Sequence, residues 1–186
     1  MDNTISKLLD FFKHIVRDLL TYILSGFVVI MNIVYTIFYF DKDEFTMLLS
    51  NTYIIWLFII FSYIVGHIIM GIMLLFLEKT KIDDILLNET KINQKKEIDI
   101  YNKNAKLYEF FIERQNQLYY TRWNLAGAFF INTFINLYLF FTYTKTIFSY
   151  LTFISILSFA FLLVLHYQTA KDYSDTINNC YDILDD

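Results

Sequence analysis

The sequence contains no proline and a single cysteine, Cys180. Without proline, no residue is present that would by itself kink or break a long helix. One cysteine cannot form a disulfide within the chain, and no companion at metal-ligand spacing accompanies it. These absences exclude a disulfide framework and a cysteine-based metal site.

Charged residues are also missing from the cores of four long blocks of the chain. Buried acids or basic residues inside a membrane mark proton pumps, voltage sensors and ion-coupled transporters. Their absence argues against those classes and against a carboxylate di-iron site. The net charge of −4 gives no footprint of nucleic-acid binding. We therefore expect no enzyme, no catalytic, cofactor or metal site, and no direct nucleic-acid binding.

The four blocks hold the hydrophobic residues, which make up 56% of the chain. A helix needs about 20 apolar residues to cross roughly 30 Å of hydrocarbon, and each block is long enough. The first block is too long for a signal peptide and no small-residue cleavage pattern follows it. The sequence predicts an all-α integral membrane fold with four transmembrane helices, at 19–40, 53–77, 124–143 and 147–167.

Short connections pair these helices as two antiparallel hairpins, 19–77 and 123–167. Thirteen of the 15 Lys and Arg residues lie before the first span, between the hairpins or after the fourth span. Only Lys42 and Lys145 lie on the other side. The excess of positive residues on cytoplasmic loops predicts that both termini are cytosolic. The expected location is the inner (cytoplasmic) membrane of a bacterium.

Three segments outside the spans are expected to be helical. Residues 1–18 form an amphipathic helix that lies in the headgroup plane or packs on a partner. The cytosolic segment 78–122 is too polar to span and too short for its own core. We expect a break at 88–96 and then a helix that runs from about Glu97 directly into the third span.

The C-terminal segment, 168–186, carries one apolar seam at spacings of four, three and four, formed by Tyr173, Ile177, Cys180 and Leu184. The helix from Glu97 carries a second apolar stripe. Two interpretations remain open. The two stripes cover each other within one chain, or they contact neighbouring subunits in an oligomer.

Polar side chains recur at a similar depth in all four spans, about 12–20 Å from the cytosolic ends. The candidate layer comprises His67, Asn32, Asn132, Asn136, Ser155 and Ser158. In the third span Asn124, Ala128, Asn132 and Asn136 repeat at four. Polar groups in hydrocarbon need partners or water, so the layer is either a hydrogen-bonded knot or the lining of a hydrated path or ligand cavity. His166 lies near the cytosolic boundary and is expected to be an interfacial side chain.

Ser62 and Gly66 form a small-xxx-small pair in the second span. Small residues let helix backbones approach closely, so we expect this pair to be a helix-packing site.

Three short motifs carry a resemblance: DLLTYILSGF from Asp18 to Phe27, YIVGH from Tyr63 to His67, and Arg122–Trp123. With its four spans, the chain resembles small four-pass bacterial membrane proteins encoded beside antiphage systems. Two such groups are the membrane subunit of Kiwa systems and the four-pass accessory proteins of type VI-B CRISPR loci. The resemblance implies a partner protein that senses infection and a membrane subunit that senses or perturbs the envelope. It transfers no site residues.

The expected function is that of a homo-oligomeric membrane effector or accessory subunit in antiphage defence, which alters permeability or senses envelope perturbation. The alternative is a non-conducting anchor or scaffold that recruits a soluble cytosolic partner. A third reading is a small membrane enzyme or carrier that uses His67. The expected partners are the lipid bilayer, further copies of the chain and a cytosolic protein.

Overall fold

The computed structural model describes residues 19–41, 52–80 and 90–185, and every element among them is helical. The elements are η1 (Leu19–Ile23), α2 (Leu24–Phe40), α4 (Thr52–Thr80), α6 (Thr90–Lys103), α7 (Ala105–Leu107), η2 (Tyr108–Ile112), α8 (Glu113–Tyr143) and α9 (Thr146–Asp185). Four helical stretches are long and apolar enough to cross a membrane, one in η1 and α2, one in α4, one in the continuous run from α7 to α8, and one in α9. The predicted all-α, multi-pass membrane fold is confirmed. The predicted amphipathic helix at 1–18 lies outside the described residues.

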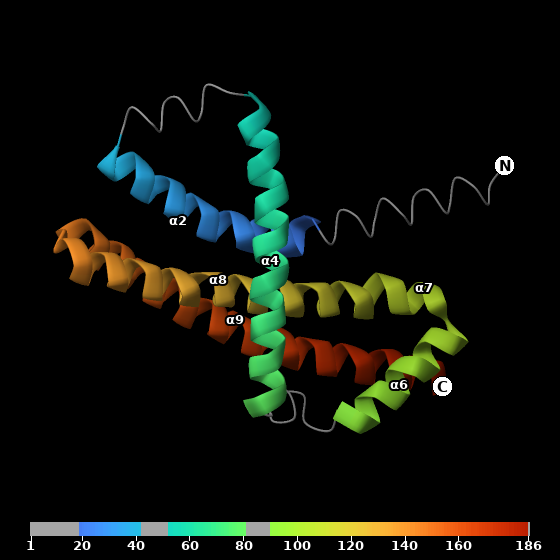
Figure 1. Cartoon of the computed structure of the whole chain (residues 1–186). Coiled ribbons are helices and arrows are strands. Elements are labelled where there is room, and N and C mark those ends of the chain that lie inside the picture. The colour runs from blue at the N-terminus through green and yellow to red at the C-terminus, as the bar shows by residue number, and fades with distance from the viewer. Residues whose placement is uncertain (1–18, 42–51, 81–89, 186) are drawn as a thin grey trace.

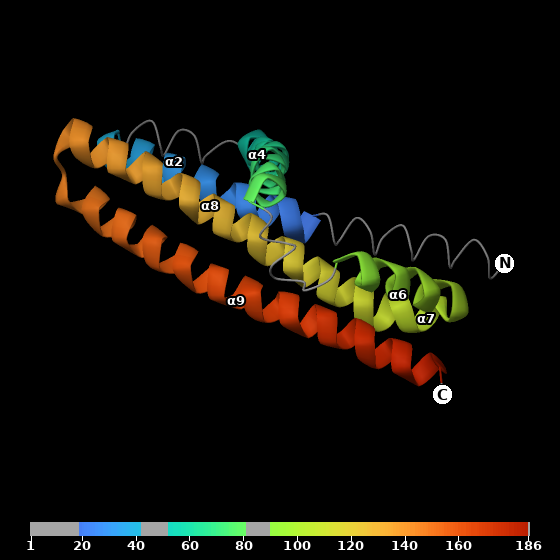
Figure 2. The same cartoon turned by 90° about the horizontal axis from the view of Figure 1, so that it is seen from below.

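Helices α8 and α9 form a long antiparallel hairpin (Figures 1 and 2). Thr144, in the left-handed conformation with φ of 52°, ends α8 and reverses the chain. Its backbone N–H donates to the carbonyl of Phe140. The expected pairing of the third and fourth spans is therefore observed.

Helix α4 crosses α2, α8 and α9 at a steep angle (Figure 1) and is seen nearly end-on when the other three lie lengthwise (Figure 2). The first two spans were expected to form an antiparallel hairpin, and this prediction is wrong because α4 crosses α2 steeply (Figures 1 and 2). A Cβ on Gly26 would collide with the backbone carbonyl of Ser62, and one on Gly66 with that of Tyr22. The two backbones thus approach closely at these small residues. Spanning helices tilt by up to about 40°, so two helices tilted in opposite senses can cross widely in one bilayer.

A second group of helices packs beyond the spans. It consists of α6, α7, η2, residues 113–122 of α8 and residues 168–185 of α9, and we call it the polar module. Its core is formed by Ile100, Ile112, Tyr173, Ile177 and Cys180. The C-terminal seam and the stripe that precedes the third span therefore cover each other within one chain.

The helical break in this module lies at Asn104, which differs from the sequence prediction. Helix α6 already begins at Thr90, so residues 90–96 of the expected break are helical. The side chain of Asn104 accepts a hydrogen bond from the backbone N–H of Leu107 and caps the next turn. A capping asparagine at this position satisfies a backbone donor that a continuous helix would have bonded internally.

Candidate functional site

The most connected polar side chain in the spans is Asn124 of α8, which is fully buried. Its Nδ2 donates to the Ser25 hydroxyl at 2.7 Å and to the carbonyl of Thr21 at 3.0 Å, and it lies 3.4 Å from the carbonyl of Gly66. One amide therefore joins η1, α2, α4 and α8 at the point where α4 crosses. A hydroxyl pair, Thr21 and Thr121 at 2.9 Å, adds a further link between η1 and α8.

Four members of the predicted polar layer make interhelical hydrogen bonds farther along the bundle. Asn132 donates to the carbonyl of Val28 at 3.2 Å and accepts from Asn32 at 3.3 Å, which joins α8 to α2. Asn136 lies 3.5 Å from the hydroxyl of Ser155, a longer contact between α8 and α9. Ser158 is half-buried on α9. These contacts tie helices together in pairs.

His67 lies apart from this layer, in contrast to the expectation. Its ring stacks on Tyr22 with centroids 3.7 Å apart and meets Tyr63 edge-on at 4.5 Å. The residue is exposed on the surface of one chain. Equal depth along each span brings side chains together only where the spans run side by side, and α4 instead crosses α2 near His67 (Figure 1).

Of the predicted packing pair, Ser62 meets Gly26 of α2 and Gly66 meets Tyr22 of η1, both in the same chain. Gly26 supplies the third small residue at the crossing, and Ser62 and Ser25 are fully buried. The pair is used within the chain, at the junction that Asn124 completes.

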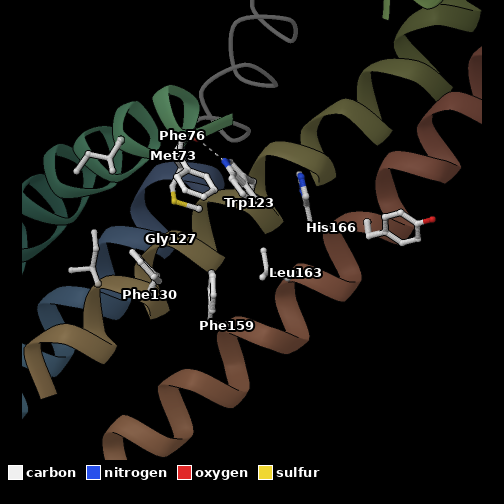
Figure 3. Close-up of a pocket in the computed structure, with 11 residues that line it drawn as sticks. Met73, Phe76, Trp123, Gly127, Phe130, Phe159, Leu163 and His166 are labelled. Atoms are coloured by element: carbon white, nitrogen blue, oxygen red, sulfur yellow. Dashed lines mark hydrogen bonds between the residues drawn. The ribbon is translucent and has the colours of Figure 1, made fainter. Parts of the chain in front are cut away.

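An apolar cavity of about 450 Å³ lies between α4, α8 and α9 (Figure 3). Its lining is Ile72, Met73, Phe76, Trp123, Gly127, Phe130, Ile131, Phe159, Leu163, His166 and Tyr167. The indole N–H of Trp123 donates to the carbonyl of Met73 at 3.1 Å, which fixes the ring as a wall. Sequence reasoning missed this cavity, because the crossing of α4 that creates it leaves no local signal.

His166 was expected at the interface but is 2% exposed. Its Nδ1 lies 3.2 Å from the carbonyl of Tyr119, and its ring contacts those of Tyr119 and Trp123 at centroid distances of 4.2 and 4.7 Å. Next to it, Arg122 donates to the carbonyl of Leu165 at 3.0 Å and to the hydroxyl of Thr169. The imidazole of His166 thus lines the cavity, and Arg122, which is not a lining residue, contacts the neighbouring turn of α9.

In the polar module, the carboxylate of Glu97 accepts hydrogen bonds from the hydroxyls of Tyr108 and Tyr173, both at 2.9 Å. Burial, and then the charge of Glu97, raise the pKa of both tyrosines well above the ordinary value. Burial also raises the pKa of the Cys180 thiol, which lies in the module core. The module is therefore held by neutral phenols on one carboxylate, and its cysteine is a poor nucleophile.

One face of the polar module carries large apolar side chains that are exposed. Phe110 is 68% exposed and meets the ring of Phe111 edge-on at 4.9 Å. With Lys106, Glu109, Arg114 and Gln117 it lines a shallow hollow, which we call the Phe110 surface. Exposed aromatic groups ringed by charges are typical of protein-interaction sites.

Among the described residues, no three His, Cys, Asp or Glu side chains group in a way that could hold a metal ion. No protein-family model, curated protein or solved structure matches this chain.

Proposed function

We propose that the chain is a non-conducting membrane anchor that holds a soluble partner at the cytosolic face of a bacterial inner membrane. The observation that carries this proposal is the use of the intramembrane asparagines. Asn124 and Asn132 direct their amides at backbone and side-chain groups of neighbouring helices in the same chain. Amide N–H groups that are already bonded to neighbouring helices of the same chain stabilise the packing of those helices.

The two longest helices support a role in transmission. Helix α9 has 40 residues, so it extends about 60 Å at 1.5 Å per residue. It runs from the membrane into the polar module without a break, and α8 does the same over 31 residues. A partner bound to the module would therefore sit on the same rigid helices that cross the membrane.

The Phe110 surface is the proposed site for that partner. The internal stripe of the module is already covered by α9, so Phe110 remains as an open apolar group beside Lys106 and Arg114. Aromatic and arginine side chains contribute most of the binding energy at protein interfaces. The resemblance to antiphage membrane subunits supports a partner that belongs to such a system.

A homo-oligomer that alters membrane permeability is the second candidate. The first half of α4 favours it, because Tyr53, Trp56 and Ile60 are 79%, 65% and 53% exposed in a single chain. This stretch has room for a second copy of the chain as well as for lipid. A pore built this way would be lined by residues that several copies contribute.

A photo-crosslinking amino acid at position 110, placed in the full chain and expressed in its native host, tests the anchor proposal. We expect one cytosolic protein to be captured, and Phe110→Ser to release that protein into the soluble fraction. Ile183→Ser is the matched control, since Ile183 is 66% exposed at the end of α9. Unchanged recruitment in Phe110→Ser would refute the proposed surface.

A membrane-potential dye separates the two candidates in the same cells. The anchor proposal expects no depolarisation with partner and trigger present. Depolarisation that depends on the chain would instead support the permeability candidate. Ion flux from liposomes between about pH 5.5 and 8 extends the test to the range in which histidine titrates.

A further inference from the structure

The cavity between α4, α8 and α9 has the size and chemistry of a binding site for a hydrocarbon chain. Its volume of about 450 Å³ lies within the range of roughly 300–1,000 Å³ typical of ligand pockets. Trp123, Phe159 and Leu163 face one another across the space between α8 and α9 (Figure 3). The indole N–H of Trp123 is already bonded to Met73, and among the other lining side chains only His166 and Tyr167 carry nitrogen or oxygen atoms. A polar ligand would lose its hydrogen bonds to water here and gain few in return.

The cavity opens on the outer surface of the spanning helices. At its rim, Ile72, Phe130 and Tyr167 are 52%, 43% and 57% exposed, and all three belong to spanning helices. The steep crossing of α4 keeps its second half away from α9 and leaves a wedge between them. Empty space of this kind forfeits dispersion contacts, so a flexible apolar chain from the surrounding lipid stabilises it by filling it.

The polar groups lie at one end of the cavity. His166 is adjacent to Arg122, whose guanidinium contacts α9 through Leu165 and Thr169 at the boundary with the polar module. A phospholipid has the complementary order, with apolar tails, then ester groups, then an anionic phosphate. Its tail would occupy the apolar end while its phosphate lies on the side of Arg122.

We propose that this cavity holds one acyl chain of a phospholipid from the leaflet next to the polar module. The site is independent of partner recruitment, because no residue of the Phe110 surface lines it. The bound chain acts as a fourth wall between α4, α8 and α9. It links the packing of α4 to the composition of the surrounding membrane.

The two tryptophans make this proposal measurable. Trp123 is 2% exposed but lines the cavity, whereas Trp56 is 65% exposed on α4. In a Trp56→Phe background, the full chain is reconstituted in nanodiscs of phosphatidylcholine with either brominated or ordinary acyl chains. Bromine quenches indole fluorescence at close contact. We expect brominated chains to quench Trp123 strongly, because an acyl chain reaches it through the cavity.

Two substitutions on α9 provide the test and its control. Leu163→Phe narrows the cavity and should abolish most of the quenching of Trp123. Leu157→Phe makes the same change at a position 54% exposed and outside the cavity, so quenching should persist. Leu163→Ala, which enlarges the space, should also retain it. A Trp123→Phe chain, with only Trp56, reports the quenching of a lipid-facing indole.

Two results would overturn the proposal. The first is equal Trp123 emission in brominated and ordinary lipid. The second is quenching that is the same in Leu163→Phe and Leu157→Phe, because lipid outside the cavity would then account for it. If Leu163→Phe lowers the melting temperature, the proposal is tested by comparing the quenching of Trp123 in Leu163→Ala with that in the parent chain. Loss of quenching in the enlarged cavity would contradict a chain bound there.

Discussion

The α8–α9 hairpin and the α2–α4 crossing are two different ways of packing a pair of spanning helices. In the hairpin, Arg122 meets Thr169 and Asn136 meets Ser155, and 14 residues separate the contacts on both helices. The register is therefore constant over about four turns. In the crossing, backbones meet only around Gly26, Ser62 and Gly66, and the helices then diverge (Figure 1).

The difference shows that membrane insertion and helix packing draw on separate features of the sequence. Length and apolarity place all four helices in the bilayer. Which helices run side by side depends on whether contacts repeat along a face or are concentrated at a few small residues.

The largest expected effect comes from Gly66→Leu at the crossing. Its Cβ would collide with the carbonyl of Tyr22, and backbone cannot move aside as a side chain can. We expect a loss of at least about 3 kcal/mol, the upper range for overpacking. Gly71→Leu is the control on the same helix, since nothing lies within 4 Å of a Cβ there. Thermal unfolding in mild detergent compares the two variants. Equal melting temperatures would contradict the close backbone approach at Gly66.

The next effect is that of Asn124→Ala, which removes the amide that joins four elements. Measured interhelical hydrogen bonds in membranes average about 0.6 kcal/mol, so the loss should be about 1–2 kcal/mol. Thr133→Val serves as the control, because the Thr133 hydroxyl bonds only to Phe129 of its own helix. Unfolding free energies in detergent should separate the two variants. A smaller loss of unfolding free energy in Asn124→Ala than in Thr133→Val would contradict the role of Asn124 in joining four elements.

A third prediction concerns pH and the polar module. Tyr108 and Tyr173 have a pKa raised by burial and by Glu97, above the unfolded value of about 10. The folded state thus keeps protons that the unfolded state releases above about pH 10. The stabilisation is complete below that pH and falls as the pH rises toward the folded pKa values.

Tyr173→Phe tests this dependence. It should cost about 1 kcal/mol at neutral pH, the usual net value of one hydrogen bond. It should also weaken the fall in stability above about pH 10, which denaturant titrations at several pH values would show. Tyr101→Phe is the control, because Tyr101 is 54% exposed. An unchanged pH dependence in Tyr173→Phe would contradict the assignment.

The smallest effect is expected for His67→Phe. The imidazole stacks on Tyr22 at the surface, and a phenyl ring preserves that stacking. Stability should change by less than about 0.5 kcal/mol, as for most surface substitutions. Partner recruitment and melting temperature are the measurements. A large loss of partner recruitment or a large drop in melting temperature would contradict this prediction and indicate a functional role for His67.

Periodicity and composition were sufficient to predict the helical class, the four spans and the seam at Tyr173, Ile177 and Cys180. These features depend on local spacing, which one sequence displays directly. The shared depth of Asn32, Asn132, Asn136 and Ser155 left two interpretations open, a hydrogen-bonded knot or the lining of a path, and in the structure these residues make hydrogen bonds between helices in pairs.

What could not be predicted depends on the angle between helices. The crossing of α4 removed His67 from the polar layer, brought Asn124 to Gly66 and opened the cavity at Trp123. The sequence marks Ser62 and Gly66 as a contact but carries no local signal for the angle at which the partner helix arrives. The break at Asn104 was missed for a related reason, because asparagine is common both inside polar helices and at their caps.

Disulfide mapping in native membranes tests the contrast between hairpin and crossing most directly. In a Cys180→Ser background, the pair Asn136→Cys with Ser155→Cys lies within the hairpin and should oxidise readily. The pair Ile33→Cys with Ile55→Cys would be in register if α2 and α4 ran side by side from the Gly26–Ser62 contact. Disulfides need Cα atoms within about 7 Å, so the crossing predicts no bond between them. Rapid oxidation within single chains at positions 33 and 55 would contradict it.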